Sequence, residues 1–330
     1  MATTDDAIAV SVVVPACGRM DLLDRSLDAL MRQNFDPQRV EIIVVDDEPN
    51  HNTLHLVAGW RTRTLERGPR LSYVANPGPS GPASARNRGW RAARAPIVAF
   101  TSDDTVPDPN WLAEGMAAFT QDTEVVCGCL QTLASSRPTE HQRSARGHEA
   151  ADFTSANCFF RKDVLVRMDG FDERFNVPRG SDADMHFRLL EHGVVISRAP
   201  RALVVHPVRP APWGASLLQI RHAVYDALLY KKHPALYRQK IEPRPRWDHY
   251  AIVGVLLLAL ASLLLGLPVA AGLAFAVWAL LTARLCAHRL RGVAHTPGIV
   301  AEMIVTSVLL PPLTVFWRLT GAVRFRVRFA

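Results

Sequence analysis

Cysteine is scarce in this sequence, and no group of cysteines suggests a crosslink or a metal centre. The five cysteines among 330 residues are Cys17, Cys127, Cys129, Cys158 and Cys286. An odd and scattered set fits neither a disulfide framework nor a zinc site. We therefore expect reduced, mostly buried thiols in a cytoplasmic domain. The first residues contain two aspartates and no basic segment followed by an apolar one, so we expect no export signal there.

An excess of positive charge is missing from the first two thirds of the chain. Residues 1–215 contain 24 lysines and arginines against 27 acidic residues, whereas residues 216–330 contain 14 against 4. The net charge of +7 therefore comes entirely from the C-terminal third. This distribution excludes a uniformly basic nucleic-acid-binding protein and indicates an electrostatic role confined to the C-terminal region.

Polar residues are nearly absent from residues 251–286, where Ser262, Thr282 and Arg284 are the exceptions. One membrane span needs about 20 residues, and this stretch has 36. Gly266, Leu267 and Pro268 lie near its middle, and proline belongs in the first turn of a helix rather than in its interior. We expect a hairpin of two short helices, about 251–266 and 268–285. One tilted span with an interfacial piece is the alternative.

Basic residues flank this apolar stretch on both sides. They are Lys231, Lys232, Arg238, Lys240, Arg244 and Arg246 before it, and Arg284, Arg289 and Arg291 after it. A hairpin places both groups on the same side of the membrane, which the positive-inside rule makes the cytoplasmic side. We therefore expect a protein of the cell inner membrane with a cytoplasmic catalytic domain.

A third apolar stretch, about 298–320, contains Glu302 and a Pro311–Pro312 pair. Four arginines lie at or after its end: Arg318, Arg324, Arg326 and Arg328. A full span would put these arginines outside, against the positive-inside rule. We expect a helix in the interface or a re-entrant helix, with a basic tail on anionic lipid headgroups. A third membrane-spanning helix is the alternative.

The preceding part of the chain alternates apolar runs with amphipathic or capped segments. The expected strands are 8–14, 41–45, 71–74 and 96–100, and the expected helices are 21–33, 52–67, 83–93 and 109–119. The apolar runs lack polar alternation, which indicates strands buried on both faces. Repeated strand–helix units predict a parallel sheet covered by helices, with ligands bound beyond the carboxyl ends of the strands.

Polar side chains follow these runs at the expected edge of the sheet. They are Pro15, Ala16 and Arg19 after the first strand, Asp46 and Asp47 after the second, Arg86 beyond a glycine-rich loop (76–82) after the third, and Asp103 and Asp104 after the fourth. Adjacent aspartates repel each other unless a cation lies between them and a ligand. Hard oxygen ligands suit Mg²⁺ or Mn²⁺, and a divalent ion bridging to a diphosphate is the simplest such cation.

Five segments, in order and spacing, resemble those of family 2 glycosyltransferases of the membrane-associated bacterial type. They are 12–16, 44–47, 81–89, 102–112 and 170–175. The resemblance covers about 8–206. It implies an α/β GT-A fold, with a Rossmann-like, mostly parallel sheet flanked by helices, here followed by a transmembrane helical hairpin. It also implies inverting transfer of a sugar from a nucleotide diphosphate donor.

The resemblance assigns donor-side roles to residues at the strand ends. Asp47, with Asp46 as the alternative, would hydrogen-bond the nucleotide base beside the turn from Pro15 through Ala16 to Arg19. Asp103 would bind the ribose, and Asp104 would ligate the metal. Arg86 would support the donor pocket, unless it is an ordinary arginine on a helix surface. His206, after the apolar run 202–205, would complete the metal shell or form a structural hydrogen bond.

The segment 180–189 resembles the family segment that carries the catalytic base. Asp182 aligns with the base, which deprotonates the acceptor hydroxyl as it attacks the anomeric carbon. Asp184 is the alternative base, or a carboxylate that stabilises the helix N-terminus. Ser181 stands where the family usually has glutamate, so the acceptor side departs from the pattern.

We expect three parts in the chain: a GT-A catalytic domain (1–212), an amphipathic or interfacial linker helix (213–248) and a C-terminal membrane region (249–330). The linker would lie on the membrane or pack on the catalytic domain. Its Gln219-Ile220-Arg221-His222 lacks the Gln-x-x-Arg-Trp element of processive synthases, which disfavours polymer synthesis.

These features predict a metal-dependent enzyme of cell-envelope polysaccharide synthesis, acting on a lipid-linked or glycan acceptor, with membrane lipids and no nucleic acid as partners. The alternative is an inactive GT-A scaffold that recruits a partner enzyme. A nucleotidyltransferase is disfavoured, because no glycine-rich loop with a following lysine lies near the first strand.

Overall fold

The computed structural model describes residues 7–64, 68–78, 81–133, 139, 140, 143, 152–207 and 211–329. The chain divides into two compact units. The first comprises Met1–Leu133 and Ala145–Val208, and the second comprises Ala134–Ser144 and Arg209–Ala330.

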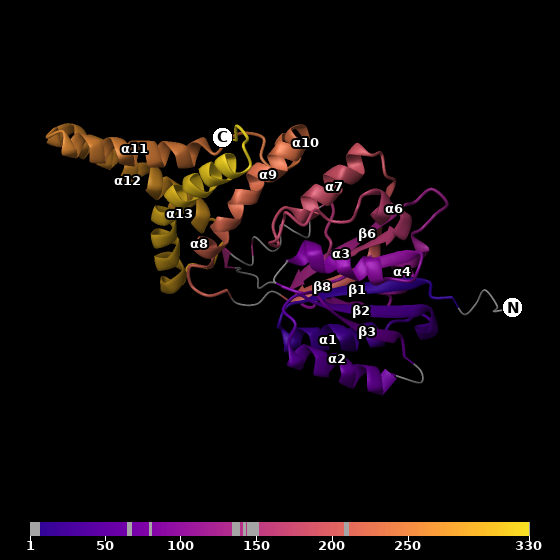
Figure 1. Cartoon of the computed structure of the whole chain (residues 1–330). Helices are drawn as coiled ribbons and strands as arrows, with labels where there is room; N and C mark the ends of the chain where they lie inside the picture. Colours follow the sequence, from indigo (N-terminus) through magenta and orange to yellow (C-terminus); the bar gives the residue numbers. More distant parts are fainter. Residues whose placement is uncertain are drawn as a thin grey trace. The chain divides into compact units, whose positions relative to one another are not determined.

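The first unit is built on an eight-stranded sheet in the order β3-β2-β1-β4-β7-β6-β8-β5 (Figure 1). The strands are β1 (Val10–Ala16), β2 (Val40–Asp46), β3 (Arg70–Ala75), β4 (Ile97–Phe100), β5 (Val106–Pro107), β6 (Val125–Leu133), β7 (Cys158–Arg161) and β8 (Ile196–Pro207). The helices are α1 (Met20–Met31), α2 (His51–Thr64), α3 (Pro82–Ala92), α4 (Trp111–Ala117), α6 (Lys162–Arg167) and α7 (Ser181–Glu191), with a 3₁₀ turn η2 (Pro37–Arg39).

The four strands and four helices expected from the sequence are confirmed. Strand β1 pairs in parallel with β2 and β4, and β2 pairs in parallel with β3. Side chains alternate between the faces of a strand, so Val12 packs on one side and Val13 on the other. Helices α1, α2 and α4 pack on the first side, and α3, α6 and α7 pack on the second. Figure 1 shows α1 and α2 together on one side of the sheet. Burial on both faces explains the absence of polar alternation.

The other half of the sheet is mixed, which the sequence patterns did not specify. Strand β7 pairs antiparallel with both β4 and β6, β6 pairs in parallel with β8, and β5 pairs antiparallel with β8. The α/β class is therefore confirmed, but the parallel arrangement is confined to β1–β4 and the β6–β8 pair. A short strand such as β7 shows no periodicity that tells its direction, since direction depends on its neighbours.

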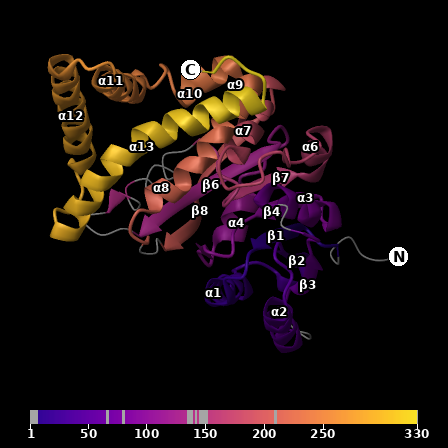
Figure 2. The same ribbon diagram turned by 60° about the vertical axis from the view of Figure 1, so that its left-hand side comes forward.

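The second unit is helical in the part that the structure describes (Figure 2). Its long helices are α11 (Trp247–Leu264), α12 (Pro268–Leu290) and α13 (Pro297–Arg324). The break between α11 and α12 falls at the expected Gly266–Pro268 turn, with proline in the first turn of α12. An 18-residue helix such as α11 is about 27 Å long, close to the thickness of a bilayer core.

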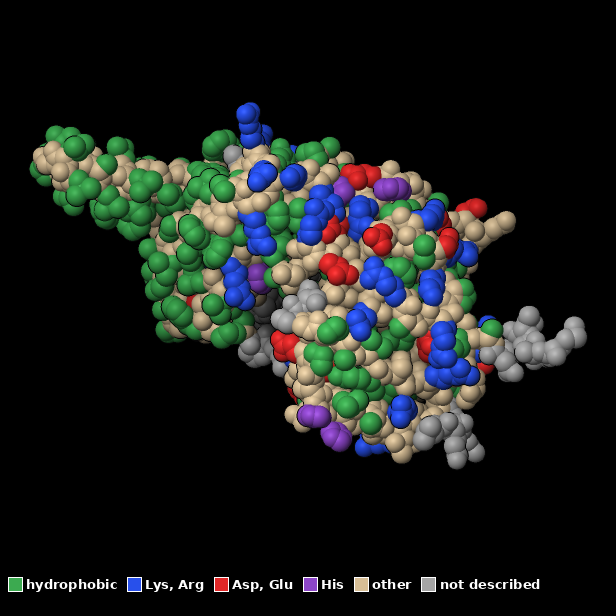
Figure 3. All heavy atoms as spheres, in the orientation of Figure 1, with side chains coloured by type: hydrophobic (Ala, Val, Ile, Leu, Met, Phe, Trp, Pro, Cys, Tyr) green, Lys and Arg blue, Asp and Glu red, His purple; other side chains and the backbone are tan. Residues whose placement is uncertain are grey.

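All three long helices are long and apolar enough to cross a membrane. Hydrophobic side chains cover the visible faces of α11 and α12 (Figure 3). Helix α13 is continuous through Pro311 and Pro312 and has 28 residues, so its length and composition favour the spanning alternative over the interfacial one.

Two of the arginines counted above, Arg289 among the residues that flank the hairpin and Arg318 in the basic tail, are buried inside the second unit. Arg289 of α12 pairs with Glu140 at 2.5 Å and donates to the hydroxyls of Thr306 and Ser307. The side chain of Arg318 in α13 is 2% exposed and pairs with Glu242 at 2.9 Å. A charge within apolar helices needs a partner, which explains their burial as ion pairs.

The expected linker helix is divided into short helices. They are α8 (Ala215–Gln219), η3 (Ile220–Ala223), α9 (Val224–Lys232) and α10 (Pro234–Lys240). Pro234 lies in the first turn of α10, a position that proline favours, so the helical run is divided between α9 and α10. The first three pack on α13, and the apolar side chains of α9 are buried. This segment is thus an integral part of the second unit.

Candidate active site at the ends of the parallel strands

A carboxylate pair lies in the turn after β4, bound by an arginine from the turn after β1. The Arg19 guanidinium donates Nε–H to Asp103 Oδ2 at 3.1 Å and Nη1–H to Asp104 Oδ2 at 2.6 Å. It also donates Nη2–H to Asp103 Oδ1. The backbone amide of Cys17 donates to Asp103 Oδ2 at 3.2 Å. The sheet brings the two turns together because β1 and β4 are parallel neighbours.

The turn that carries these aspartates is fixed by threonine hydroxyls. Thr101 and Thr105 share a hydrogen bond of 2.8 Å between their Oγ1 atoms. The amide of Ser102 donates to Thr105 Oγ1 at 3.1 Å, and Thr105 Oγ1 donates to the Ser102 carbonyl at 2.7 Å. Both threonine side chains are buried, so the turn has a defined shape before any ligand binds.

The two carboxyl groups differ in their electrostatics. Burial raises the pKa of Asp103 to about 6, and the neighbouring Asp104 charge acts in the same direction against Arg19. Burial also disfavours the charge on Asp104, but the nearby His206 imidazole and the charge of Arg19 outweigh it and hold its pKa well below the usual range. Asp104 is therefore the more stable anion of the two.

His206 is close to the carboxylate pair, as the resemblance implied. It lies near the end of β8, and its Nε2 is 3.7 Å from Asp104 Oδ2. Among the described residues, no three His, Cys, Asp or Glu side chains form a ready-made metal cluster. A carboxylate and an imidazole still fit the donor preferences of Mn²⁺, and Mg²⁺ commonly takes one or two protein ligands plus substrate phosphates. The residues fit an ion completed by a bound diphosphate.

The aspartates after β2 have different surroundings. Asp46 is fully buried and accepts hydrogen bonds from the Tyr73 hydroxyl at 3.0 Å and the Asn50 amide at 3.2 Å. Asp47 is partly exposed and accepts from the Asn76 side chain at 2.7 Å and the Gly81 amide at 3.1 Å. Asp46 is therefore engaged within the protein, which leaves Asp47 as the better placed of the two for a ligand.

The turn after β1 lines the same edge of the sheet. Pro15 and Ala16 are the last residues of β1, and both are buried. The Ala16 carbonyl accepts from the Asp47 amide at 2.8 Å, which ties the two turns together. Pro79 and Ser80 of the glycine-rich loop lie outside the described residues.

Arg86 is buried in α3, so its interpretation as an ordinary helix-surface arginine is wrong. It is 9% exposed, its guanidinium lies 5.5 Å from the Phe171 ring centre, and its Nη1 donates to the Pro82 carbonyl at 3.2 Å. Its buried Nε has no hydrogen-bond partner within the described protein. A buried guanidinium with an unused donor is a candidate contact for an anion.

The two candidate base residues of α7 differ in accessibility. Asp182 is partly exposed, and both of its oxygens are held by Ser155, whose amide donates at 3.0 Å and whose hydroxyl donates at 2.6 Å. Asp184 is fully buried and pairs with Arg188 at 2.9 Å. Arg188 also donates to the carbonyls of Met168 and Gly170, so Asp184 belongs to a buried network that joins α7 to the 168–170 turn.

Asp182 lies at the same edge of the sheet as Asp103. Cys158, the first residue of β7, pairs with Phe100, the last residue of β4. Ser155, whose amide and hydroxyl donate to the two oxygens of Asp182, comes three residues before Cys158, so Asp182 lies near this strand end. The carboxylate pair follows three residues after Phe100.

The structure adds residues that sequence reasoning missed. Tyr73, Asn76 and Ser155 each hold one of the candidate aspartates. Asn76 was visible as part of the loop after the third strand, whereas Tyr73 and Ser155 carried no motif. Their role depends on a partner 27 residues away in each case, which no local pattern reveals.

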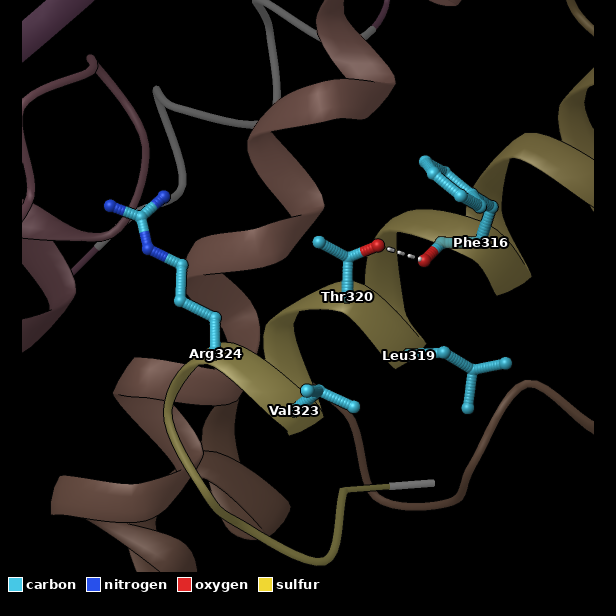
Figure 4. A pocket seen from close by; sticks show the side chains of 5 residues that line it. All are labelled: Phe316, Leu319, Thr320, Val323 and Arg324. Atoms are coloured by element: carbon cyan, nitrogen blue, oxygen red, sulfur yellow. Dashed lines mark hydrogen bonds between the residues drawn. The ribbon is translucent and has the colours of Figure 1, made fainter.

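A cavity elsewhere has a different chemistry. It lies along the C-terminal part of α13 and is lined by Phe316, Leu319, Thr320, Val323 and Arg324 (Figure 4). Thr320 turns its hydroxyl to the Phe316 carbonyl at 2.8 Å, so the lining is almost entirely apolar (Figure 4). Such a lining suits hydrocarbon rather than a nucleotide sugar.

The fold and the acidic side chains at its strand ends define an α/β protein whose ligand site lies beyond the carboxyl ends of the strands. The comparisons identify the family within that class. Residues 11–171 match the model of glycosyl transferase family 2, and residues 97–318 match that of glycosyl transferase family group 2. The chain belongs to the family 2 glycosyltransferases.

Relatives of known name agree with this assignment. The chain is 29% identical over 268 residues to a validoxylamine A glucosyltransferase of Streptomyces hygroscopicus subsp. limoneus, covering 69% of this chain and 57% of that protein. It is 23% identical over 211 residues to glycosyltransferase AglE of Haloferax volcanii, covering 61% of this chain and 67% of that protein. The chain therefore spans little more than half the length of the glucosyltransferase.

A solved structure supports the fold. The mannosyltransferase PcManGT from Pyrobaculum calidifontis, in complex with GDP-Man and Mn²⁺, is similar with a TM-score of 0.56 and 19% identity. The similarity covers 96% of this chain and 86% of that one. The GT-A fold expected from the sequence is confirmed.

Proposed function

We propose that this chain is an inverting, metal-dependent glycosyltransferase that transfers a sugar from a nucleoside diphosphate donor to a lipid-linked or cell-envelope glycan acceptor. The observation that carries the proposal is the Asp103–Asp104 pair, bracketed by Arg19 and His206, at the same sheet edge as Asp182. The donor complex of the mannosyltransferase with GDP-Man and Mn²⁺ gives a precedent for such a donor and ion.

The donor would bind across the ends of β1, β2 and β4. Asp47 is proposed to accept a hydrogen bond from the base, with the Pro15–Ala16 turn as the wall of that pocket. Asp103 would accept one from the ribose. Asp104 and His206 would hold Mg²⁺ or Mn²⁺, which supplies Lewis-acid stabilisation of the leaving diphosphate. The buried guanidinium of Arg86, with its unused Nε donor, would support the anionic side of the pocket.

Asp182 is proposed as the base that takes the proton from the acceptor hydroxyl. Direct displacement needs one carboxylate on the acceptor side and no protein nucleophile. Partial exposure and two hydrogen bonds from Ser155 support Asp182, because an accessible and oriented carboxylate can reach an acceptor. Asp184 is proposed to orient α7 through Arg188, since it is buried and already paired.

The second unit is proposed to anchor the enzyme in the cell inner membrane, with the catalytic unit in the cytoplasm. Three helices of sufficient length and apolarity support this attachment. Residues 1–212 would form the catalytic domain, 213–248 the linker and 249–330 the membrane region. Lysines and arginines on both flanks of the hairpin support the cytoplasmic orientation, apart from Arg289, which is paired internally.

Transfer assays on membranes test the proposal. Membranes containing the protein are incubated with a panel of radiolabelled nucleotide sugars and Mn²⁺, and lipid and polymer fractions are counted. Asp104→Ala is expected to abolish transfer. An inactive scaffold, which Ser181 in place of glutamate would favour, should show no metal-dependent heat when titrated with nucleoside diphosphates. Transfer that persists in Asp104→Ala would remove the assigned metal role.

A further inference from the structure

Arg19 occupies the position between the two carboxylates at which a cation is required. Its three donor nitrogens reach three of the four oxygens of Asp103 and Asp104, so one planar guanidinium neutralises much of the pair. The Arg19 side chain is 40% exposed, whereas that of Asp103 is fully buried and that of Asp104 is 21% exposed. The arginine therefore covers the carboxylates from the solvent side.

Arg19 and a bound metal ion would compete for the same oxygen, Asp104 Oδ2. Asp104 Oδ2 accepts from Arg19 Nη1 at 2.6 Å and lies 3.7 Å from His206 Nε2. It is the oxygen of Asp104 closest to the second candidate ligand, and a metal would approach it to about 2.1 Å. A guanidinium hydrogen-bonded to the same oxygen would then face a divalent cation at very short range, which electrostatic repulsion forbids.

We infer that Arg19 is the resident counter-cation of the carboxylate pair in the free enzyme, and that a divalent metal must displace it. The inference rests on the proposed metal role of Asp104. The guanidinium stays protonated at every physiological pH, so it cannot leave by losing its charge and has to turn away. Its exposed side gives it room to do so.

Displacement has a consequence for the order of binding. A metal alone replaces the charge-assisted hydrogen bonds of Arg19 by coordination bonds to the same carboxylates and gains little. A metal that arrives with a diphosphate brings further ligands, and the released guanidinium then lies beside an anion that it can bind in a bidentate manner. Metal and nucleotide should therefore bind together, with strong positive coupling, rather than metal first.

The test measures Mn²⁺ binding directly rather than through activity. The full-length protein in detergent is titrated with Mn²⁺ while free Mn²⁺ is followed by electron paramagnetic resonance, without nucleotide and with UDP or GDP. Arg19→Gln is compared with the wild type. Arg32→Gln is the matched control. Arg32 also pairs with an aspartate, Asp28, but this pair is exposed and lies at the C-terminal end of α1. Arg19→Lys keeps the charge without the planar fork.

Without nucleotide, Arg19→Gln is expected to bind Mn²⁺ roughly 10- to 100-fold more tightly than the wild type, the range that the loss of charge-assisted hydrogen bonds predicts. Arg19→Lys should lie in between, and Arg32→Gln should match the wild type. Nucleoside diphosphate should tighten Mn²⁺ binding more in the wild type than in Arg19→Gln. Equal Mn²⁺ affinity of the wild type and both Arg19 variants without nucleotide overturns the inference.

Asp104→Ala separates this inference from the proposed function. If Asp104→Ala loses Mn²⁺ binding in the presence of nucleotide while Arg19→Gln changes nothing, the metal site stands and the role of Arg19 fails. If Asp104→Ala binds Mn²⁺ as well as the wild type does, the proposed metal site itself fails, and the inference with it.

Discussion

Separate replacement of Asp182 and Asp184 by asparagine should change different quantities. The first substitution should lower kcat, and the second should lower the free energy of unfolding. Asp182→Asn removes the proposed base but keeps an acceptor for the Ser155 hydroxyl, so we expect kcat to fall about 10²- to 10⁴-fold. The side chain is partly exposed, and the free energy of unfolding should change by no more than about 1 kcal/mol.

Asp184→Asn should show the reverse pattern. The carboxylate is fully buried, and its partner Arg188 is 16% exposed, so the substitution leaves a guanidinium charge without its counter-ion. Breaking a buried ion pair costs about 3–5 kcal/mol, and the retained hydrogen bonds of Arg188 to two carbonyls place the loss near the lower end. The fraction that remains folded should still transfer sugar at a rate close to that of the wild type.

The assay pairs single-turnover transfer with urea unfolding of the same preparations, followed by tryptophan fluorescence. Active-site titration with labelled donor corrects kcat for unfolded protein. Wild-type turnover in Asp182→Asn, together with lost turnover at unchanged stability in Asp184→Asn, would refute the reasoning and exchange the two roles.

Three further predictions concern stability. Burial raises the pKa of Glu41, but hydrogen bonds from Ser11 and Arg94 outweigh burial and leave that pKa lowered. Glu41→Gln should therefore have a lower free energy of unfolding than the wild type at pH 7. In urea titrations, this difference in free energy should shrink as pH falls below about 4.3. Gly170 has φ +67°, and a Cβ there would lie 2.2 Å from Asn87 Oδ1, so Gly170→Ala should lower the free energy of unfolding by roughly 3 kcal/mol or more. Gly193 has φ +65° and open space around its Cβ position, so Gly193→Ala should cost only about 1–2 kcal/mol for the backbone. Equal losses of stability in thermal unfolding would contradict the steric argument. Glu140→Ala should destabilise the second unit by about 3 kcal/mol because it leaves the buried Arg289 without its counter-ion. The added substitution Arg289→Met should recover much of that loss in thermal unfolding in detergent. A double variant less stable than Glu140→Ala would contradict the pairing.

The sequence by itself determined the elements of the catalytic half and the division of the apolar C-terminal region. Short apolar runs without polar alternation are a local property, and so is the Gly266–Pro268 break, because a glycine closely followed by a proline favours the end of one helix and the start of the next. The rule that ligands bind at the carboxyl ends of parallel strands then brought Asp46, Asp103 and the first turn to one edge without any coordinates.

Only the tertiary structure decided what each polar side chain does there. Arg19 and Asp103 are 84 residues apart, and Ser155 and Asp182 are 27 apart, so their pairing depends on strand order and not on a local pattern. The same holds for burial: Asp46 and Asp47 are neighbours in sequence, yet one is fully buried against Tyr73 and the other is partly exposed. Charge counts placed Arg289 among the basic residues that flank the hairpin and Arg318 in the basic tail, whereas glutamates distant in sequence hold both side chains inside the second unit. Local composition fixes which segments form strands and helices, but the free energy of burying a charge depends on which partner the fold brings to it.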